Sequence, residues 1–246
     1  MRTLKLTLAY DGTNYVGWQR QANGLAVQQA VEEAFAPLVG GVAPTVAGAS
    51  RTDAGVHALG QVASVTVDLD LSTAAVQRAM NVRLPADIRV TDVVLATPGF
   101  HARHHAASKA YRYRIVTTPV LSPFDRWFVW HSPEPRDVAL MQRAAAAFVG
   151  RHDFASFQAR GASVRDTVRT ITRLAIEPVP DGLVIDVAGD GFLRHMVRAI
   201  VGTLADVGAG LYPPEAVEAM LAARHRQAAG PTAPASGLTL LAVHYL

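Results

Sequence analysis

Residues 169–187 have the sequence RTITRLAIEPVPDGLVIDV, which decides the predicted fold class. The runs Arg169–Ile176 and Leu183–Val187 are rich in apolar and β-branched residues, and Pro180-Asp181-Gly182 between them is a typical turn sequence. The stretch therefore predicts a β-hairpin. Helical patterns lie on both sides of it in the chain, and hairpins mixed with helices predict an α+β protein with antiparallel sheets.

The sequence around this hairpin predicts further helices and strands in the second half of the chain. They are a strand at Tyr111–Val116, a helix from about Arg136 to Phe148, a long helix with Met196, Ile200, Leu204 and Val207 on one face, a shorter helix after Pro213-Pro214, and a last strand at Leu238–Tyr245. Gly230–Pro234 contains too many turn-forming residues for regular structure.

The first half of the chain predicts strands and helices in alternation. The predicted elements are a strand at Thr3–Ala9, a helix at Val27–Leu38 ended by Gly40-Gly41, a strand at Gln61–Val67, a helix from the N-cap Ser72 to about Arg83, and a strand at Ile88–Leu95. The second half repeats this order only in outline. We expect an N-terminal α/β half at residues 1–105 and a C-terminal α/β half at residues 106–246.

Composition excludes several classes of protein. No apolar run approaches the roughly 20 residues of a membrane-spanning helix, and the charged start at Met1–Leu6 does not resemble a signal peptide. We therefore expect a cytoplasmic protein. The chain has no cysteine, which excludes disulfides, thiolate catalysis and cysteine-ligated metal sites.

The charge of the chain is compatible with a nucleic-acid partner. Its formal net charge is +3 and its pI is about 9.5, and the only lysines are Lys5 and Lys109, so arginine supplies nearly all the positive charge. An arginine bias also follows from a GC-rich coding sequence. Composition alone leaves a phosphate-binding surface and an ordinary charged surface equally open.

The segment Gly48–Ala58, GASRTDAGVHA, is the first candidate for chemistry. It places a cation, Arg51, and a carboxylate, Asp53, among small residues in a predicted loop, which is where sites usually lie. The structural alternative is that Asp53 forms an Asx-turn near Gly55 and that Arg51 is a solvated neighbour. On its own, the segment favours this alternative.

The segment Lys109–Ile115 interleaves aromatic and basic residues. In a strand, Tyr111 and Tyr113 would share one face, and Arg112 and Arg114 the other. Aromatic faces stack on extruded bases and guanidinium groups bind phosphates, so the pattern fits an RNA surface. A core-facing tyrosine strand with ordinary arginines outside is the alternative, and the segment alone slightly favours it.

The segment Gly191–Ile200 places Arg194 and Arg198 four residues apart on a predicted helix whose other face is apolar. A partly buried arginine there needs an acidic partner, and a nucleophilic carboxylate needs a cation. The alternative is that both side chains extend along the helix into solvent. The histidines around His101-Ala102-Arg103-His104-His105 and at His152-Asp153 give little support for a metal site, because Arg103 lies among the supposed ligands and no supporting carboxylate spacing accompanies them.

Several segments together resemble the tRNA pseudouridine synthase A (TruA) family over nearly the whole chain. The similar blocks, in order, are Tyr10-Asp11-Gly12, Gly17-Trp18-Gln19, Arg51–Ala58, Phe100-His101-Ala102-Arg103, Tyr111-Arg112-Tyr113, His152-Asp153-Phe154 with Phe157, Arg169-Thr170-Ile171, Gly191–Gly202, and Ala233-Pro234 with Gly237-Leu238. The sequence departs from the family pattern at His104-His105, where an aromatic and a small residue are more usual, and at Ser50, where glycine is common.

The resemblance implies a function and a set of site residues. Asp53 is then the nucleophile, Tyr111 stacks on the target base, Arg198 pairs with Asp53, and Arg51 fills the gap left by the flipped nucleotide. The implied reaction isomerises uridine to pseudouridine at positions 38, 39 and 40 of the tRNA anticodon arm, without metal or organic cofactor. Whether Asp53 attacks C1′ or acts elsewhere on the sugar stays open.

The resemblance also implies an architecture and a partner. It implies the α+β pseudouridine synthase fold, with antiparallel sheets flanked by helices in two pseudo-symmetric halves around a central cleft. The N-terminal half carries the catalytic Asp loop and the C-terminal half completes the cleft. The implied partners are tRNA and a second copy of the chain in a homodimer, with no membrane.

Two other functions remain as alternatives. A non-catalytic tRNA-binding module would use the same basic and aromatic surface, and its binding would not depend on Asp53. A histidine-ligated metal hydrolase acting on phosphate esters would contain bound metal.

Overall fold

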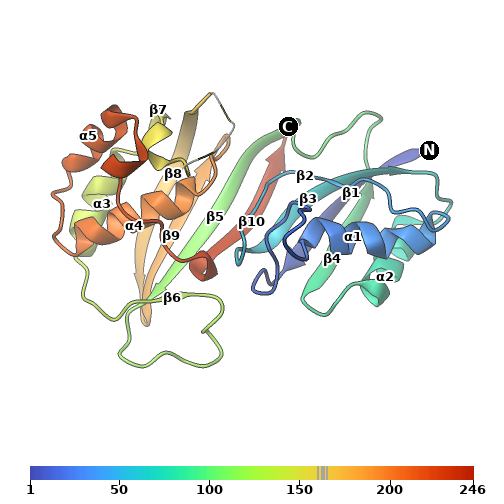
Figure 1. The fold of residues 1–246 in the computed structure, drawn as a ribbon, viewed down its shortest axis with the longest axis horizontal. Helices are drawn as coiled ribbons and strands as arrows, with labels where there is room; N and C mark the ends of the chain where they lie inside the picture. The colour runs from blue at the N-terminus through green and yellow to red at the C-terminus, as the bar shows by residue number, and fades with distance from the viewer. Residues whose placement is uncertain (160, 162–163, 165) are drawn as a thin grey trace. The chain divides into compact units, whose positions relative to one another are not determined.

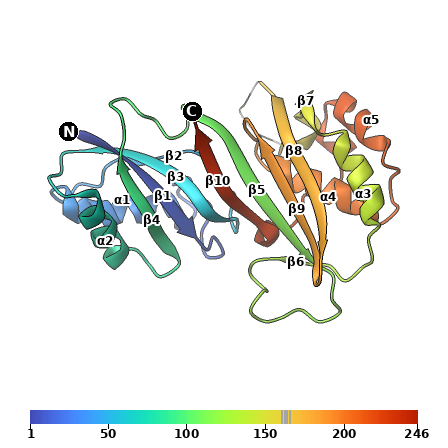
Figure 2. The same cartoon turned by 180° about the vertical axis from the view of Figure 1, so that it is seen from behind.

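The computed structural model describes residues 1–159, 161, 164 and 166–246 (Figures 1 and 2). The contacts within the chain gather in two units. One consists of Met1–Ala107 together with Thr239–Leu246, and the other is Ser108–Leu238. This division differs from the expected halves at the C-terminus, because the last strand returns to the first unit.

The first unit is a sheet with two helices. Its elements are β1 (Arg2–Tyr10), α1 (Val27–Phe35), β2 (Ala47–Gly48), β3 (His57–Val67), α2 (Thr73–Arg83), β4 (Ile88–Leu95) and β10 (Leu238–Tyr245). The strand order is β4-β1-β3-β10, with β2 paired to β3. β1 is antiparallel to both of its neighbours and β10 is parallel to β3. Both helices lie on one face of this sheet (Figure 1).

The predicted alternation forms the core of this unit. Leu4, Leu6 and Leu8 of β1 are completely buried.

The Ser72 side chain caps α2 as predicted, accepting a hydrogen bond from the Ala75 N–H at 3.2 Å. The prediction for Val27–Leu38 was wrong at its end: α1 stops at Phe35 and a 3₁₀ turn covers Ala36–Leu38. Proline within this turn has no N–H to continue the α-helix.

The described residues of the second unit form a mainly antiparallel sheet with three α-helices. Its elements are β5 (Ala106–Val116), β6 (Trp130–His131), α3 (Val138–Ala146), β7 (Gly150–Asp153), β8 (Val168–Val179), β9 (Gly182–Gly189), α4 (Met196–Gly208) and α5 (Ala216–Ala223). The strand order is β5-β9-β8-β7, and the short β6 lies parallel to the end of β5. The turned view shows α4 behind β8 and β9 (Figure 2).

The predicted hairpin is present as β8 and β9. Val179 pairs with Gly182, so Pro180-Asp181 forms the two-residue connection and Gly182 belongs to the strand rather than to the turn. A Cβ at Gly182 would lie 2.0 Å from the carbonyl oxygen of Ile115, so the close approach of β5 requires glycine here. The α+β class is confirmed, and the sheet is mixed: most of its strand pairs are antiparallel, whereas β10 with β3 and β6 with β5 are parallel. In the described part of the chain, no helix is long and apolar enough to span a membrane.

Candidate active site

The loop between β2 and β3 carries Arg51 and Asp53. Arg51 is exposed and Asp53 is half-buried. A main-chain turn lies at Gly55: the Val56 N–H donates to the Asp53 carbonyl oxygen at 3.1 Å, and Gly55 has a φ of 75°. This bond differs from the Asx-turn of the structural alternative, in which the Asp53 side chain would be the acceptor. The main chain thus reverses directly after Asp53.

Thr52, which precedes Asp53, is fixed through both its side chain and its main chain. Its hydroxyl lies 2.7 Å from the Tyr10 hydroxyl, and its carbonyl oxygen accepts the Trp18 N–H at 3.0 Å. Thr52 is buried, so these partners replace water. Tyr10 and Trp18 come from two of the sequence blocks that precede the loop.

Gln61 fixes the main chain of Ser50, the residue that precedes Arg51. Its amide oxygen accepts the Ser50 N–H at 3.2 Å, and its amide nitrogen donates to the Ser50 carbonyl at 2.7 Å and to the Tyr10 hydroxyl at 3.4 Å. Gln61 is completely buried. Sequence reasoning missed this residue, although a glutamine inside an apolar strand is the signal that could have found it.

Gly17 brings a neighbouring segment against the same loop. A Cβ at this position would lie 2.6 Å from the Thr52 carbonyl oxygen and 3.1 Å from the Ala54 nitrogen. Its φ of 106° also favours glycine. Contacts on Ser50, Thr52 and Ala54 therefore fix the main chain on both sides of Asp53.

Tyr111 and Tyr113 lie on the buried face of β5, as the alternation predicted. Tyr111 is 5% exposed and packs edge-on against Phe192, with ring centroids 5.2 Å apart. Burial raises the pKa of the Tyr113 phenol well above its ordinary value, so the hydroxyl stays protonated and donates to the Pro234 carbonyl at 2.7 Å.

The arginines of β5 are paired with acidic residues. Arg112 forms a two-pronged ion pair with Asp186 at 2.8 and 2.9 Å. Arg114 bridges Asp125 at 3.3 Å and Asp181 at 3.0 Å. These carboxylates offset the charge that would attract RNA phosphates. The structure therefore favours the core-facing strand over an RNA surface at Arg112 and Arg114.

Arg198 lies in the first turn of α4 and is half-buried. Its Nε donates to the Ala233 carbonyl at 2.7 Å, while the Ala233 N–H donates to the Arg198 carbonyl at 3.0 Å. The prediction that Arg194 lies on the same helix was wrong. The helix begins only at Met196, because His195 at the N-cap has a left-handed φ of 63°, and the exposed Arg194 therefore precedes the helix.

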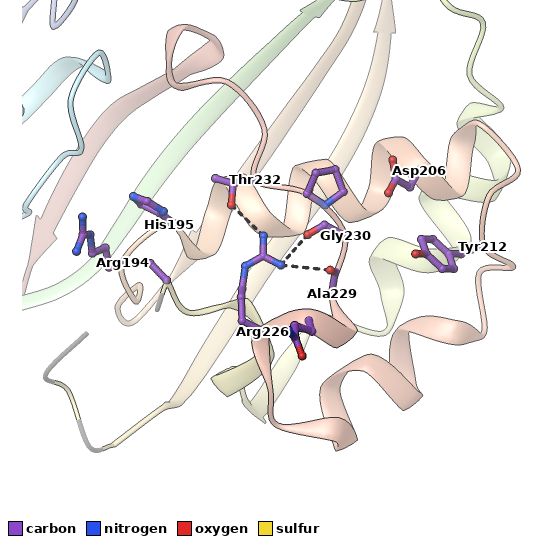
Figure 3. A pocket seen from close by; sticks show the side chains of 11 residues that line it. Arg194, His195, Asp206, Tyr212, Arg226, Ala229, Gly230 and Thr232 are labelled. Atoms are coloured by element: carbon purple, nitrogen blue, oxygen red, sulfur yellow. Dashed lines mark hydrogen bonds between the residues drawn. The ribbon is translucent and has the colours of Figure 1, made fainter. Parts of the chain in front are cut away.

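The segment Ala229–Ala233, which holds Arg198, is itself held by Arg226 (Figure 3). The guanidinium donates to the carbonyl oxygens of Ala229 at 3.2 Å and Gly230 at 2.8 Å, and to the Thr232 hydroxyl at 2.9 Å. These residues line a pocket of about 590 Å³ together with Arg194, His195 and Tyr212. Sequence reasoning missed Arg226.

Thr203 joins this segment to α4 from the buried side. Its hydroxyl accepts the Gly230 N–H at 2.9 Å and donates to the Ala199 carbonyl at 2.8 Å, and the side chain is completely buried. The hydroxyl therefore provides a hydrogen-bond acceptor for the buried Gly230 N–H, which lies outside the helices and strands.

We expect Thr203→Val to lower the free energy of unfolding by about 1–3 kcal/mol, because valine keeps the shape but leaves the Gly230 N–H without its acceptor. Urea unfolding followed by circular dichroism measures the change. Thr203→Ser keeps the hydroxyl and is the control. A valine variant as stable as the wild type would show that this hydrogen bond contributes nothing.

In the described part of the chain, no group of three or more His, Asp or Glu side chains that could hold a metal ion comes together. The Asp153 carboxylate has its partners within the second unit. Its carboxylate accepts from the Thr167 hydroxyl and the Ala155 N–H and pairs with Arg224. The Thr167 hydrogen bond is the main reason why the pKa of Asp153 lies below its ordinary value, ahead of the Ala155 and Arg224 contacts.

Comparison with known proteins identifies the family. A sequence model of the family described as tRNA pseudouridine synthase matches residues 7–103 and 144–246. The tRNA pseudouridine synthase A of Syntrophotalea carbinolica is 49% identical over 245 residues, which cover 100% of this chain and 97% of that protein. The protein of the same name from Pelobacter propionicus is also 49% identical, with 100% of both chains covered. The chain therefore belongs to the tRNA pseudouridine synthase family, a family of isomerases.

Proposed function

We propose that this chain isomerises uridine to pseudouridine at positions 38, 39 and 40 of the tRNA anticodon stem-loop, with Asp53 as the nucleophile. The observation that carries the proposal is the fixed main chain around Asp53. Tyr10, Trp18 and Gln61 hold Ser50 and Thr52, so a half-buried carboxylate is presented on a loop with little freedom. Such preorganisation is what a nucleophile requires.

The reaction is balanced without a second substrate. The N1–C1′ bond of uridine breaks, the base turns, and a C5–C1′ bond forms, while C5 loses a proton and N1 gains one. No redox step and no leaving group remain to be supplied. A positioned carboxylate can support such a sequence of steps by nucleophilic catalysis at the sugar.

The target base must leave the RNA stack before it can react. Extrusion costs a few kcal/mol, and stacking on an aromatic side chain returns about 1–3 kcal/mol per base. We assign the stacking to Tyr111 and the filling of the gap to Arg51, whose side chain is exposed beside Asp53. Arg198 is proposed as the cation that keeps Asp53 ionised.

A tRNA substrate implies a cytoplasmic enzyme, and we propose that it acts as a homodimer whose two chains together hold the tRNA. Light scattering of the purified protein measures the mass in solution. A mass of one chain at the concentration used for activity would contradict the dimer.

The function is tested with an unmodified tRNA transcript incubated with the purified protein. Carbodiimide labelling followed by primer extension maps pseudouridine along the RNA. We expect stops at positions 38 to 40 wherever the transcript has uridine there, and loss of each stop when that uridine is replaced by cytidine. Stops elsewhere, or none despite tRNA binding, would reject the proposed site or reaction.

The role of Tyr111 is tested by two substitutions. We expect Tyr111→Leu to lower the single-turnover rate of pseudouridine formation about 10- to 100-fold more than Tyr111→Phe, because phenylalanine keeps the aromatic face. Thermal unfolding of both variants controls for lost packing against Phe192. Equal rates for the two variants would rule out stacking as the role of Tyr111.

A further inference from the structure

The turn His101–His105 lies between β4 and β5 in the first unit and is firmly anchored. The His105 N–H donates to the His101 carbonyl at 3.1 Å. The Ala102 N–H donates to the Ser64 hydroxyl at 3.0 Å, and its carbonyl accepts the Tyr245 hydroxyl at 2.7 Å. Ala102 is completely buried, so the side chains around it are displayed from a rigid support.

The hydrogen bonds of this turn determine the tautomers of two imidazole rings. Nδ1 of His101 accepts the N–H groups of Arg103 at 3.1 Å and His104 at 3.4 Å, and Nδ1 of His105 accepts the His101 N–H at 3.1 Å. A nitrogen that accepts carries no proton. In the neutral rings the proton therefore lies on Nε2, on the opposite side of each ring.

The turn presents exposed hydrogen-bond donors. Arg103, His104 and His105 are exposed, and the His104 ring lies 4.2 Å from that of His101. Among the described residues, no carboxylate forms an ion pair with Arg103, in contrast to Arg112 and Arg114. A further cation is close, because Lys5 Nζ lies 4.6 Å from the centre of the Tyr245 ring.

Charge and hydrogen-bonding capacity here match an anion with several oxygens. The guanidinium supplies a permanent charge in a planar fork, and an imidazole ring carries at least one N–H donor in either of its protonation states. Burial, followed by the coulombic effect of His104, lowers the pKa of His101.

We propose that the His101–His105 turn binds a backbone phosphate of the tRNA through the Arg103 guanidinium and the imidazole N–H groups of His104 and His105. This inference rests on the proposed function. Ser64, which anchors the turn, is seven residues beyond His57 on β3, so the turn lies about 23 Å along the strand from the end that follows the Asp53 loop. The phosphate bound here belongs to a nucleotide remote from the target uridine.

The test compares equilibrium tRNA binding at about pH 8, where ordinary imidazoles are neutral. The variants are Arg103→Gln and the double variant His104→Gln/His105→Gln, in which glutamine can still accept the His101 N–H. Arg78→Gln is the matched control, because Arg78 is an exposed arginine on α2 of the same unit. Thermal unfolding shows that each variant is folded.

We expect Arg103→Gln to raise the Kd about three- to tenfold and to reduce the slope of log Kd against log salt by about 1. The double variant should raise the Kd about threefold, and Arg78→Gln should leave it unchanged. Ethylation of one phosphate should weaken binding to the wild type but not to Arg103→Gln.

Wild-type affinity and salt dependence in both turn variants would overturn the inference. Pseudouridine formation by the wild type on the same transcript is measured in parallel. Product from the wild type with unchanged binding by the variants rejects the phosphate site alone, whereas weakened binding by the variants without any wild-type product rejects the proposed reaction and retains the site.

Discussion

Asp53→Asn is expected to lower the rate of pseudouridine formation at least about 1,000-fold, while tRNA binding and the fold stay as in the wild type. Asparagine has the shape of aspartate but no nucleophilic carboxylate. The anchors of the loop act on Ser50, Thr52 and the Asp53 carbonyl oxygen, and the substitution leaves all of these groups in place.

Single-turnover assays with excess protein measure this effect separately from product release. Asp92→Asn is the matched control, because Asp92 is an exposed carboxylate on β4 of the same unit. Binding of the transcript is measured for all three proteins. Full activity of Asp53→Asn would remove Asp53 from the mechanism, and a wild type that binds tRNA without any product would favour the binding module.

Local periodicity was sufficient to predict most of the helices and strands. The bounds of β4 at Ile88–Leu95 and of β10 at Leu238–Tyr245 are those that alternation predicts. β5 instead begins at Ala106, five residues before the predicted start, because the small and polar residues before Tyr111 have no alternating pattern. Pairing of Lys109 and Ala110 with β9 extends the strand there, which is a tertiary effect.

The short strands could not be predicted for a related reason. β2 and β6 have two residues each, too few to show any period, and the four residues of β7 are mostly polar. Each exists because a longer neighbour offers hydrogen-bonding groups at its edge. The sequence pattern thus predicted the long strands that form the core and missed the short strands that pair with them.

The candidate site shows the same limit. The Asp53 loop was recognised from contiguous residues, but the side chains that fix it lie elsewhere in the sequence. Tyr10 lies on β1, far before the loop, and Gln61 lies on β3, the strand that follows it. Arg226 and Thr203 both form hydrogen bonds to Gly230, in the segment Ala229–Ala233, and no local sequence pattern predicts these contacts. For Arg112, the alternation correctly predicted which face of β5 carries the side chain. Its partner Asp186 became evident only from the pairing of β5 with β9.

Gly17→Ala is expected to lower the single-turnover rate about 10- to 100-fold by displacing the Asp53 loop. The new Cβ would lie 2.6 Å from the Thr52 carbonyl oxygen and 3.1 Å from the Asp53 carbonyl carbon, and the three atoms nearest to it are all main chain. The loop must therefore move by several tenths of an ångström or more. Misplacement of a reacting group by about 1 Å can cost about 100-fold in rate.

Gly99→Ala separates this displacement from backbone strain. Gly99 also has a positive φ, 79°, but its Cβ would meet nothing within 4 Å. Gly99→Ala should lose about 1–2 kcal/mol of stability because alanine disfavours the left-handed region, and Gly17→Ala should lose more because its Cβ also meets main-chain atoms. Only Gly17→Ala should lose activity at a temperature where both are folded. If the two variants lose activity equally, strain rather than the position of the Asp53 loop limits the rate, and the scaffold provided by the Gly17 segment has no catalytic role.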